Sequence, residues 1–260
     1  MYKILKYSFA DLTRSRWSYV YLAFYLVLGF VLLFLNNDLS KAVITLMNII
    51  VVLTPMIGTI FGIMYFYSAR EFTELLLAQP IKRSHIFLGQ FLGIALSLSL
   101  SLVIGLGIPF LIYGVALSSD IWDFGLLLVV GAFLTFIFVA LAVNISLRNE
   151  NKVKGFGYAI LLWLFMAVIY DGLFLISLLV FDDYPLDKFT LAVSMFNPID
   201  LSRIMILLKL DISALLGYTG ALFQNFFGNG SGMLVSFLML TMWACVPVWF
   251  LVKTARKKDF

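Results

Sequence analysis

Six long stretches without charged side chains restrict the fold of this chain more than any other feature. They cover residues 17–37, 42–69, 86–119, 124–147, 155–181 and 212–252, and only the fifth holds a charge, Asp171. A membrane-spanning helix needs about 20 apolar residues. The chain is 63% hydrophobic and 12% charged, whereas soluble proteins average about 25% charged residues. The sequence therefore predicts an all-α polytopic membrane protein.

These stretches predict six transmembrane helices within a single domain of residues 1–260. We place the spans at residues 17–36, 43–67, 89–115, 123–147, 156–181 and 233–252. The first part of the last stretch, about 212–232, is broken by Gly217, Gly220, Gly228, Asn229, Gly230 and Gly232 and is expected to form a surface helix and turn.

The positions of the basic residues predict the orientation of the chain. An even number of spans brings both termini, and the loops around residues 70–85 and 148–154, to one side. That side holds 14 of the 18 Lys and Arg residues: Lys3, Lys6, Arg14, Arg16, Arg70, Lys82, Arg83, Arg148, Lys152, Lys154, Lys253, Arg256, Lys257 and Lys258. Positive residues stay in the cytoplasm, so both termini are predicted to be cytoplasmic.

The first fifteen residues are expected to form a helix that lies in the membrane interface. Residues 2–15 place Ile4, Leu5, Phe9 and Leu12 on one side and basic residues on the other. A flanking basic tail is the alternative. A signal peptide is not expected, because the charged stretch is long and the following apolar run has spanning length.

The residues that chemistry would need are scarce. The chain has no Gly-x-x-x-x-Gly-Lys-Ser/Thr phosphate loop, so we expect no ATP site. It has one histidine, His85, and one cysteine, Cys245, which cannot assemble a tetrahedral zinc site. We therefore predict no metal site, no cofactor and no enzyme activity in this chain, and any chemical energy must come from a partner.

A stripe of small residues runs along the third predicted span at four-residue intervals. It consists of Gly89, Gly93, Ser97, Ser101 and Gly105. Small residues at this spacing let another helix backbone approach closely. The sequence predicts a tight helix–helix seam and leaves open whether the second helix belongs to the same chain.

Asp171 follows Tyr170 in the middle of the fifth predicted span. A carboxylate at the bilayer centre costs at least about 2.5–3.5 kcal/mol, so such a residue usually faces a polar pathway or a partner. One interpretation makes Asp171 and Tyr170 candidates for a membrane pathway. The other is a protonated, structural Asp171 that is hydrogen-bonded to Tyr170 or a nearby hydroxyl.

The segment 182–232, on the predicted outer side, contains sequence signals for two helices. Asn197 and Pro198 form a helix start, apolar residues follow from Ile199, and Asp211 can cap a second helix over residues 212–227. Apolar helices outside the bilayer must bury a face against membrane or protein. The two helices can therefore be covered by the membrane, by each other or by another protein.

On the basic side, residues 70–83 form a short amphipathic segment. Phe72, Leu75, Leu76 and Gln79 fall on one helical face, and Pro80 should end the helix at Gln79. This segment, the six spans and the N-terminal helix together resemble the permeases of ABC-2 type transporters. In that family the segment is a coupling helix that rests on a separate ATPase subunit.

The resemblance implies two copies of the permease and two of an ATPase that binds ATP and Mg in place of this chain. Residues expected to meet the ATPase are Arg70, Glu71, Glu74, Leu75, Pro80, Lys82, Arg83, Arg148 and Lys152. The segment 148–154 is either a second contact or only a basic anchor. The implied location is a bacterial cytoplasmic membrane.

Two further stretches narrow the resemblance. Residues 154–163, continuing to Tyr170 and Asp171, and residues 195–204 with 211–221 are similar to permeases that serve the maturation of nitrous oxide reductase, a periplasmic copper enzyme. That similarity implies a periplasmic copper-handling β-helix protein as a partner, with mechanical transmission or export of a sulfur species. The residues expected to dock this partner are Asn197, Pro198, Asp200, Arg203, Asp211 and Tyr218. The alternatives are a general exporter of lipid, drug or ion, and a membrane enzyme with Asp171 as catalytic acid.

Overall fold

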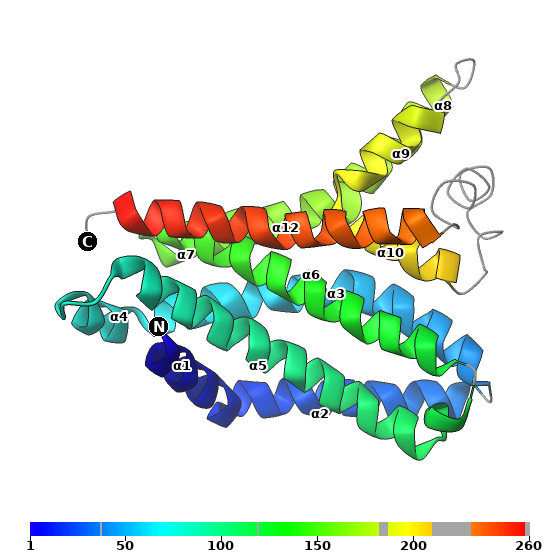
Figure 1. Cartoon of the computed structure of the whole chain (residues 1–260), viewed down its shortest axis with the longest axis horizontal. Helices are drawn as coiled ribbons and strands as arrows, with labels where there is room; N and C mark the ends of the chain where they lie inside the picture. Colours follow the sequence, from blue (N-terminus) through cyan, green and yellow to red (C-terminus); the bar gives the residue numbers. More distant parts are fainter. Residues whose placement is uncertain (37, 119, 182–186, 210–229, 258–260) are drawn as a thin grey trace.

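The computed structural model describes residues 1–36, 38–118, 120–181, 187–209 and 230–257 (Figure 1). Within these ranges every regular element is a helix, and six helices are long and apolar enough to cross a membrane, which confirms the predicted fold class. They are Arg16–Leu35, Leu39–Ser68, Arg83–Ile112, Ile121–Arg148, Lys152–Ser177 and Gly232–Arg256. The expected helix at 212–227 lies outside the described residues.

The helices follow one another with short connections. In chain order they are α1 (Tyr2–Arg14), α2 (Arg16–Leu35), α3 (Leu39–Ser68), α4 (Arg70–Leu77), α5 (Arg83–Ile112), α6 (Ile121–Arg148), α7 (Lys152–Leu164), α8 (Tyr170–Val180), α9 (Asp187–Met195), α10 (Pro198–Lys209) and α12 (Gly230–Lys257). A 3-10 turn, Val115–Leu117, precedes α6, and a π-helical segment, Phe165–Ile169, joins α7 to α8.

Both chain termini and α4 lie at one end of the bundle (Figure 1). We call this the basic end, because it carries the cluster of Lys and Arg residues described above. The opposite end, with the connection from α2 to α3 and the turn before α6, we call the acidic end. Asp38 caps α3 there, by accepting a hydrogen bond from the Ser40 amide at 3.1 Å.

Helices α3, α5 and α6 form the centre of the bundle. In the most apolar 18-residue stretch of each span, 61% of the residues are buried in α5 and in α6, compared with 11% in the fifth span and 22% in the sixth. Gly62 of α3 brings α6 close, since a Cβ there would lie 3.0 Å from the Cβ of Ala142. The outer faces of the fifth and sixth spans are therefore left for lipid or for another chain.

The small-residue stripe of α5 packs against α1 and α2 of the same chain. A Cβ at Gly93 would lie 2.7 Å from the Ser8 Cβ and 2.9 Å from the Phe9 nitrogen, both on α1. A Cβ at Gly105 would lie 2.8 Å from the Cβ of Tyr25 on α2. The N-terminal residues are thus a packed helix rather than a flanking tail, and the seam lies within one chain.

The outer part of the chain departs from the prediction. Helix α8 leaves the bundle with α9, and α10 then returns along α12 (Figure 1). Residues Phe189–Met195 and Pro198–Leu207 form an apolar pair bent by 112°. The apolar residues of α10 were expected to be covered, and Ile199, Leu201, Ile204, Met205, Ile206 and Leu207 are all buried. The covering comes from α3, α6 and α12 of the same chain, so α10 packs on the bundle and does not form a separate outer surface.

The close approach at Gly93 predicts a stability difference between two glycines of one helix. Gly93→Ala should lower the free energy of unfolding by about 1–3 kcal/mol, because the new methyl meets the α1 backbone. Gly107→Ala is the matched control, since nothing lies within 4 Å of a Cβ at that position of α5. Thermal unfolding in detergent should show a lower midpoint for the first variant only, and equal midpoints would contradict the packing of α1 on α5.

Candidate functional site

Helix α4 at the basic end is held by its inward side. Thr73 and Leu76 are buried, and the Gln90 side-chain amide of α5 donates a 2.7 Å hydrogen bond to the Thr73 hydroxyl. Phe72 stacks on Tyr7 of α1, with ring centroids 4.5 Å apart. The helix therefore rests on both α1 and α5 while it continues directly from the end of α3.

The boundaries and faces of α4 differ from the prediction in two respects. The helix ends at Leu77 rather than Gln79, and the Gln79 amide makes a tighter turn by donating to the Leu76 carbonyl. Leu75 does not share the inward face of Leu76; it is 68% exposed. The inward face follows Thr73 and Leu76, and that direction points Leu75 away from the bundle.

The outward face of α4 combines charge with this exposed leucine. The Arg70 Nε donates to the Glu74 Oε1 at 3.0 Å, and both side chains are exposed. The remaining predicted contact residues of this segment, Glu71, Pro80, Lys82 and Arg83, are also exposed. An apolar side chain amid charged ones at the rim of a membrane protein is a typical partner contact.

The segment between α6 and α7 is attached to the end of α3. The Tyr67 hydroxyl donates a 2.7 Å hydrogen bond to the Asn149 carbonyl. Asn151 caps α7, because its Oδ1 accepts from the amides of Val153 at 2.9 Å and Lys154 at 3.2 Å. Arg148 and Lys152 are exposed beside these contacts. This short segment is thus a capped helix start that is attached to α3.

The two predicted contact segments line one cleft of about 610 Å³ at the basic end. Its walls come from the end of α3, from α4 and from the end of α6: Phe66, Tyr67, Arg70, Thr73, Glu74, Leu77, Ala78, Arg83, Ser146, Asn149 and Glu150. The sequence missed Tyr67 as a member of this site, whereas Asn149 and Glu150 belong to the segment 148–154 that it named as a candidate contact. The sequence signal for the proximity of the two segments was the length of the spans between them, which brings both segments to the same end of the bundle.

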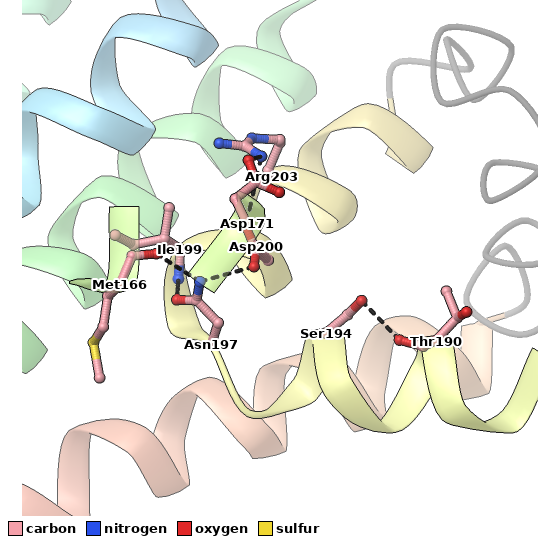
Figure 2. A network of polar contacts seen from close by, with 8 residues as sticks. All are labelled: Met166, Asp171, Thr190, Ser194, Asn197, Ile199, Asp200 and Arg203. Atoms are coloured by element: carbon pink, nitrogen blue, oxygen red, sulfur yellow. Dashed lines mark hydrogen bonds and ion pairs between the residues drawn. The ribbon is translucent and has the colours of Figure 1, made fainter. Parts of the chain in front are cut away.

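A second polar group lies where α8 leaves the bundle (Figure 2). The Arg203 guanidinium of α10 donates a 2.9 Å hydrogen bond to the Asp171 Oδ2 and lies 3.5 Å from the Asp200 Oδ1. Tyr170 does not bond Asp171; its hydroxyl donates to the Val193 carbonyl at 2.6 Å. The predicted alternative of an Asp171–Tyr170 hydrogen bond is therefore wrong, because Arg203 supplies an opposite charge.

The expected docking surface on α10 is not exposed. Asn197 is 1% exposed, Asp200 is 6% exposed and Pro198 is also buried. As surface residues these three were predicted wrongly, because α10 is surrounded by α3, α6 and α12. Asp211 and Tyr218 lie outside the described residues, so their docking role stays a prediction.

The architecture defines the class of protein: a polytopic helical membrane protein with a short helix seated across its basic end. Residues 21–252 match the family model described as "ABC-2 family transporter protein". The chain therefore belongs to the ABC-2 transporter family and is a membrane permease component. Members of this family are parts of membrane transporters and are not themselves catalytic.

Two curated relatives carry the printed name "Probable ABC transporter permease protein NosY". The protein of Stutzerimonas stutzeri is 30% identical over 187 residues, which cover 67% of this chain and 62% of the relative. The protein of Pseudomonas aeruginosa is 32% identical over 146 residues, which cover 54% of this chain and 53% of the relative. Each alignment thus spans less than two thirds of the relative's length.

The tie between α3 and the second loop predicts a local effect of removing one hydroxyl. Tyr67→Phe should deprotect the amides of residues 153–155 about 2- to 10-fold, because a hydrogen bond contributes about 0.5–1.5 kcal/mol. Hydrogen–deuterium exchange would measure this change. Tyr158→Phe, at an exposed position of α7, is the control and should leave the same amides unchanged. Unaltered exchange in Tyr67→Phe would mean that this tie does not order the loop.

Proposed function

We propose that this chain couples ATP hydrolysis in a separate ATPase subunit to movement of its membrane helices. The observation that carries the proposal is the 610 Å³ cleft, which presents both predicted contact segments on one surface. Membership of the ABC-2 family supports a separate ATPase, which would bind the ATP and Mg.

The contacts of α4 describe how a push on this surface would spread. Helix α3 is joined to α4 through the single residue Ala69, so a displacement of α4 would be passed to that span. The Thr73–Gln90 hydrogen bond connects α4 to α5, and the stacked Phe72 and Tyr7 rings connect it to α1. Three helices of the bundle thus receive the motion from one eight-residue element.

The basic end is the side on which the ATPase would bind. Positive residues concentrate there, which places that end and both termini in the cytoplasm under the positive-inside rule. For a bacterial permease this orientation corresponds to the inner membrane. The acidic end would then face the periplasm.

The biological role that we propose is the maturation of the copper sites of nitrous oxide reductase. The two relatives named NosY support it. The partners would be two NosF-like ATPase chains, a second permease copy and a NosD-like periplasmic copper-handling protein. The chain would transmit force to that protein, export a sulfur species, or do both.

A general ABC-2 exporter of lipid, drug or ion is the second candidate. The burial of Asn197, Pro198 and Asp200 favours it, because these residues were to form part of the periplasmic docking surface. A membrane enzyme that uses Asp171 as its acid fits less well. The Asp171 carboxylate is already engaged by the Arg203 guanidinium at 2.9 Å.

The exposed leucine of α4 provides a direct test of the coupling surface. Leu75→Glu should weaken binding of the ATPase about 10- to 100-fold, because burial of a leucine side chain contributes about 1.5–3 kcal/mol. Co-purification and ATPase activity of the reconstituted complex measure this effect. Leu117→Glu is a matched control, since Leu117 is 96% exposed at the opposite end. Equal loss in both variants, or none in either, would argue against α4 as the contact.

The proposed biological role predicts a copper phenotype. A strain that lacks this chain should make nitrous oxide reductase protein with little of its copper, and a plasmid copy should restore the metal. Metal analysis of the purified enzyme measures this result. A normal copper content in the deleted strain, with altered lipid composition or drug tolerance, would favour the general exporter instead.

A further inference from the structure

The fifth span is interrupted at its middle by the π-helical segment Phe165–Ile169. The Tyr170 amide donates to the Phe165 carbonyl, five residues earlier, instead of to the Met166 carbonyl, as it would in an α-helix. The Met166 carbonyl thus loses the Tyr170 amide as a donor. An unpaired carbonyl inside an apolar bundle is costly, so it needs a donor from elsewhere.

Asn197, at the start of α10, supplies that donor. Its Nδ2 donates to the Met166 carbonyl at 2.8 Å and to the Asp200 Oδ2 at 2.8 Å, while its Oδ1 accepts from the Ile199 amide at 3.1 Å (Figure 2). The side-chain amide is therefore used at both ends, and its orientation is defined by three partners. Asn197 therefore holds the fifth span at Met166, near the start of the π-helical segment.

Arg203 holds the same span on the outer side of the interruption. Its guanidinium donates to the Asp171 carboxylate at 2.9 Å, and the two side chains are 25% and 32% exposed. Asp200 lies between the two attachments, 3.5 Å from Arg203 and hydrogen-bonded to Asn197. The fifth span is thus held at two points by the start of α10. Asn197 contacts Met166, within the π-helical segment, and Arg203 contacts Asp171, after it.

The parts on either side of the interruption differ in how firmly they are held. Helix α7 is tied to α3, since the Trp163 Nε1 donates to the Val52 carbonyl at 3.3 Å. Before α10, the Met195 carbonyl accepts from the Trp243 Nε1 of α12 at 3.1 Å. Helix α8 has no buried residue among those that the structure describes, and it points away from the bundle with α9 (Figure 1). The pair is thus held to the bundle at its two ends, near the π-helical segment and at Met195, the last residue of α9. Helix α9 buries Thr190 and Ser194, so α8 is the part of the pair without a buried anchor.

We propose that the α8–α9 pair is an arm that pivots at the π-helical segment, and that Asn197 and Arg203 are positioning residues of a lock that holds it. The lock consists of the Asn197–Met166 hydrogen bond and the Arg203–Asp171 ion pair. When the ion pair opens, the arm swings and the outer half of the fifth span changes its position against α10. That this swing follows ATP hydrolysis rests on the proposed permease function; the lock itself does not.

Pulsed electron spin resonance on the full-length permease in nanodiscs tests the lock. Exposed Cys245 is first changed to Ser, and spin labels are placed by Leu179→Cys on the arm and Leu117→Cys on the bundle, which are 80% and 96% exposed. Arg203→Gln should raise the ratio of displaced to seated arms about tenfold, because a charge-assisted hydrogen bond contributes enough for that change. Lys41→Gln, an exposed cation at the acidic end, is the control and should leave the ratio unchanged.

The swapped pair Asp171→Arg with Arg203→Asp separates the lock from a general loss of structure. It should restore the seated distribution, which a purely structural role of Arg203 would not produce. If Arg203→Gln does not fold, Asp171→Asn removes the same ion pair from the other side and should give the same tenfold rise. An unchanged distribution in folded Arg203→Gln or Asp171→Asn would overturn the proposal.

Addition of the ATPase and ATP then tests the coupling separately. A swing that depends on ATP supports both the lock and the proposed function. A lock that responds to Arg203→Gln but not to ATP would keep the lock and count against the proposed coupling.

Discussion

The need of every buried backbone group for a hydrogen-bond partner is the constraint on which the rest of this structure depends. In hydrocarbon, water cannot replace a missing partner, so the spans must be helices and any interruption must be compensated by side chains. The single π-helical segment of the described spans illustrates this rule. The Tyr170 amide donates to the Phe165 carbonyl and not to the Met166 carbonyl, so the Met166 carbonyl accepts instead from the Asn197 side chain. This hydrogen bond joins the start of α10 to the fifth span.

The same bundle transmits motion because its elements approach closely where it matters. Gly93 and Gly105 let α5 contact the backbones of α1 and α2, and α1 in turn supports α4 through Tyr7. A rigid, closely packed set of helices moves as a unit when one member is pushed. Helix α8, which has no buried residue among those that the structure describes, lies outside this set together with α9. The protein thus combines a stiff body at the basic end with an outer element attached by polar contacts at its base.

Features that depend on local composition were predicted well, and features that depend on which helix lies beside which were not. Five of the six predicted spans lie within five residues of the candidate spans at both ends; the third begins six residues and ends three residues earlier than expected. The N-terminal helix was also expected. The inward direction of α4, and hence the exposure of Leu75, was missed because Phe72, Leu75 and Leu76 are all apolar and the pattern alone does not choose among them. The pairing of Asp171 with Arg203 joins residues 32 positions apart in sequence, and no periodicity reports such a contact.

The sequence by itself determined that this is a six-span helical membrane protein with a basic end, because charge and apolar length have the same meaning in any membrane. It also determined the stripe of small residues on α5, though not its partner. Only the tertiary structure decided that the stripe meets α1 and α2, that the two basic segments share a cleft, and that α10 lies inside the bundle. The reason is physical: burial of a helix face depends on the shape and polarity of its neighbours, and those are set when the helices pack.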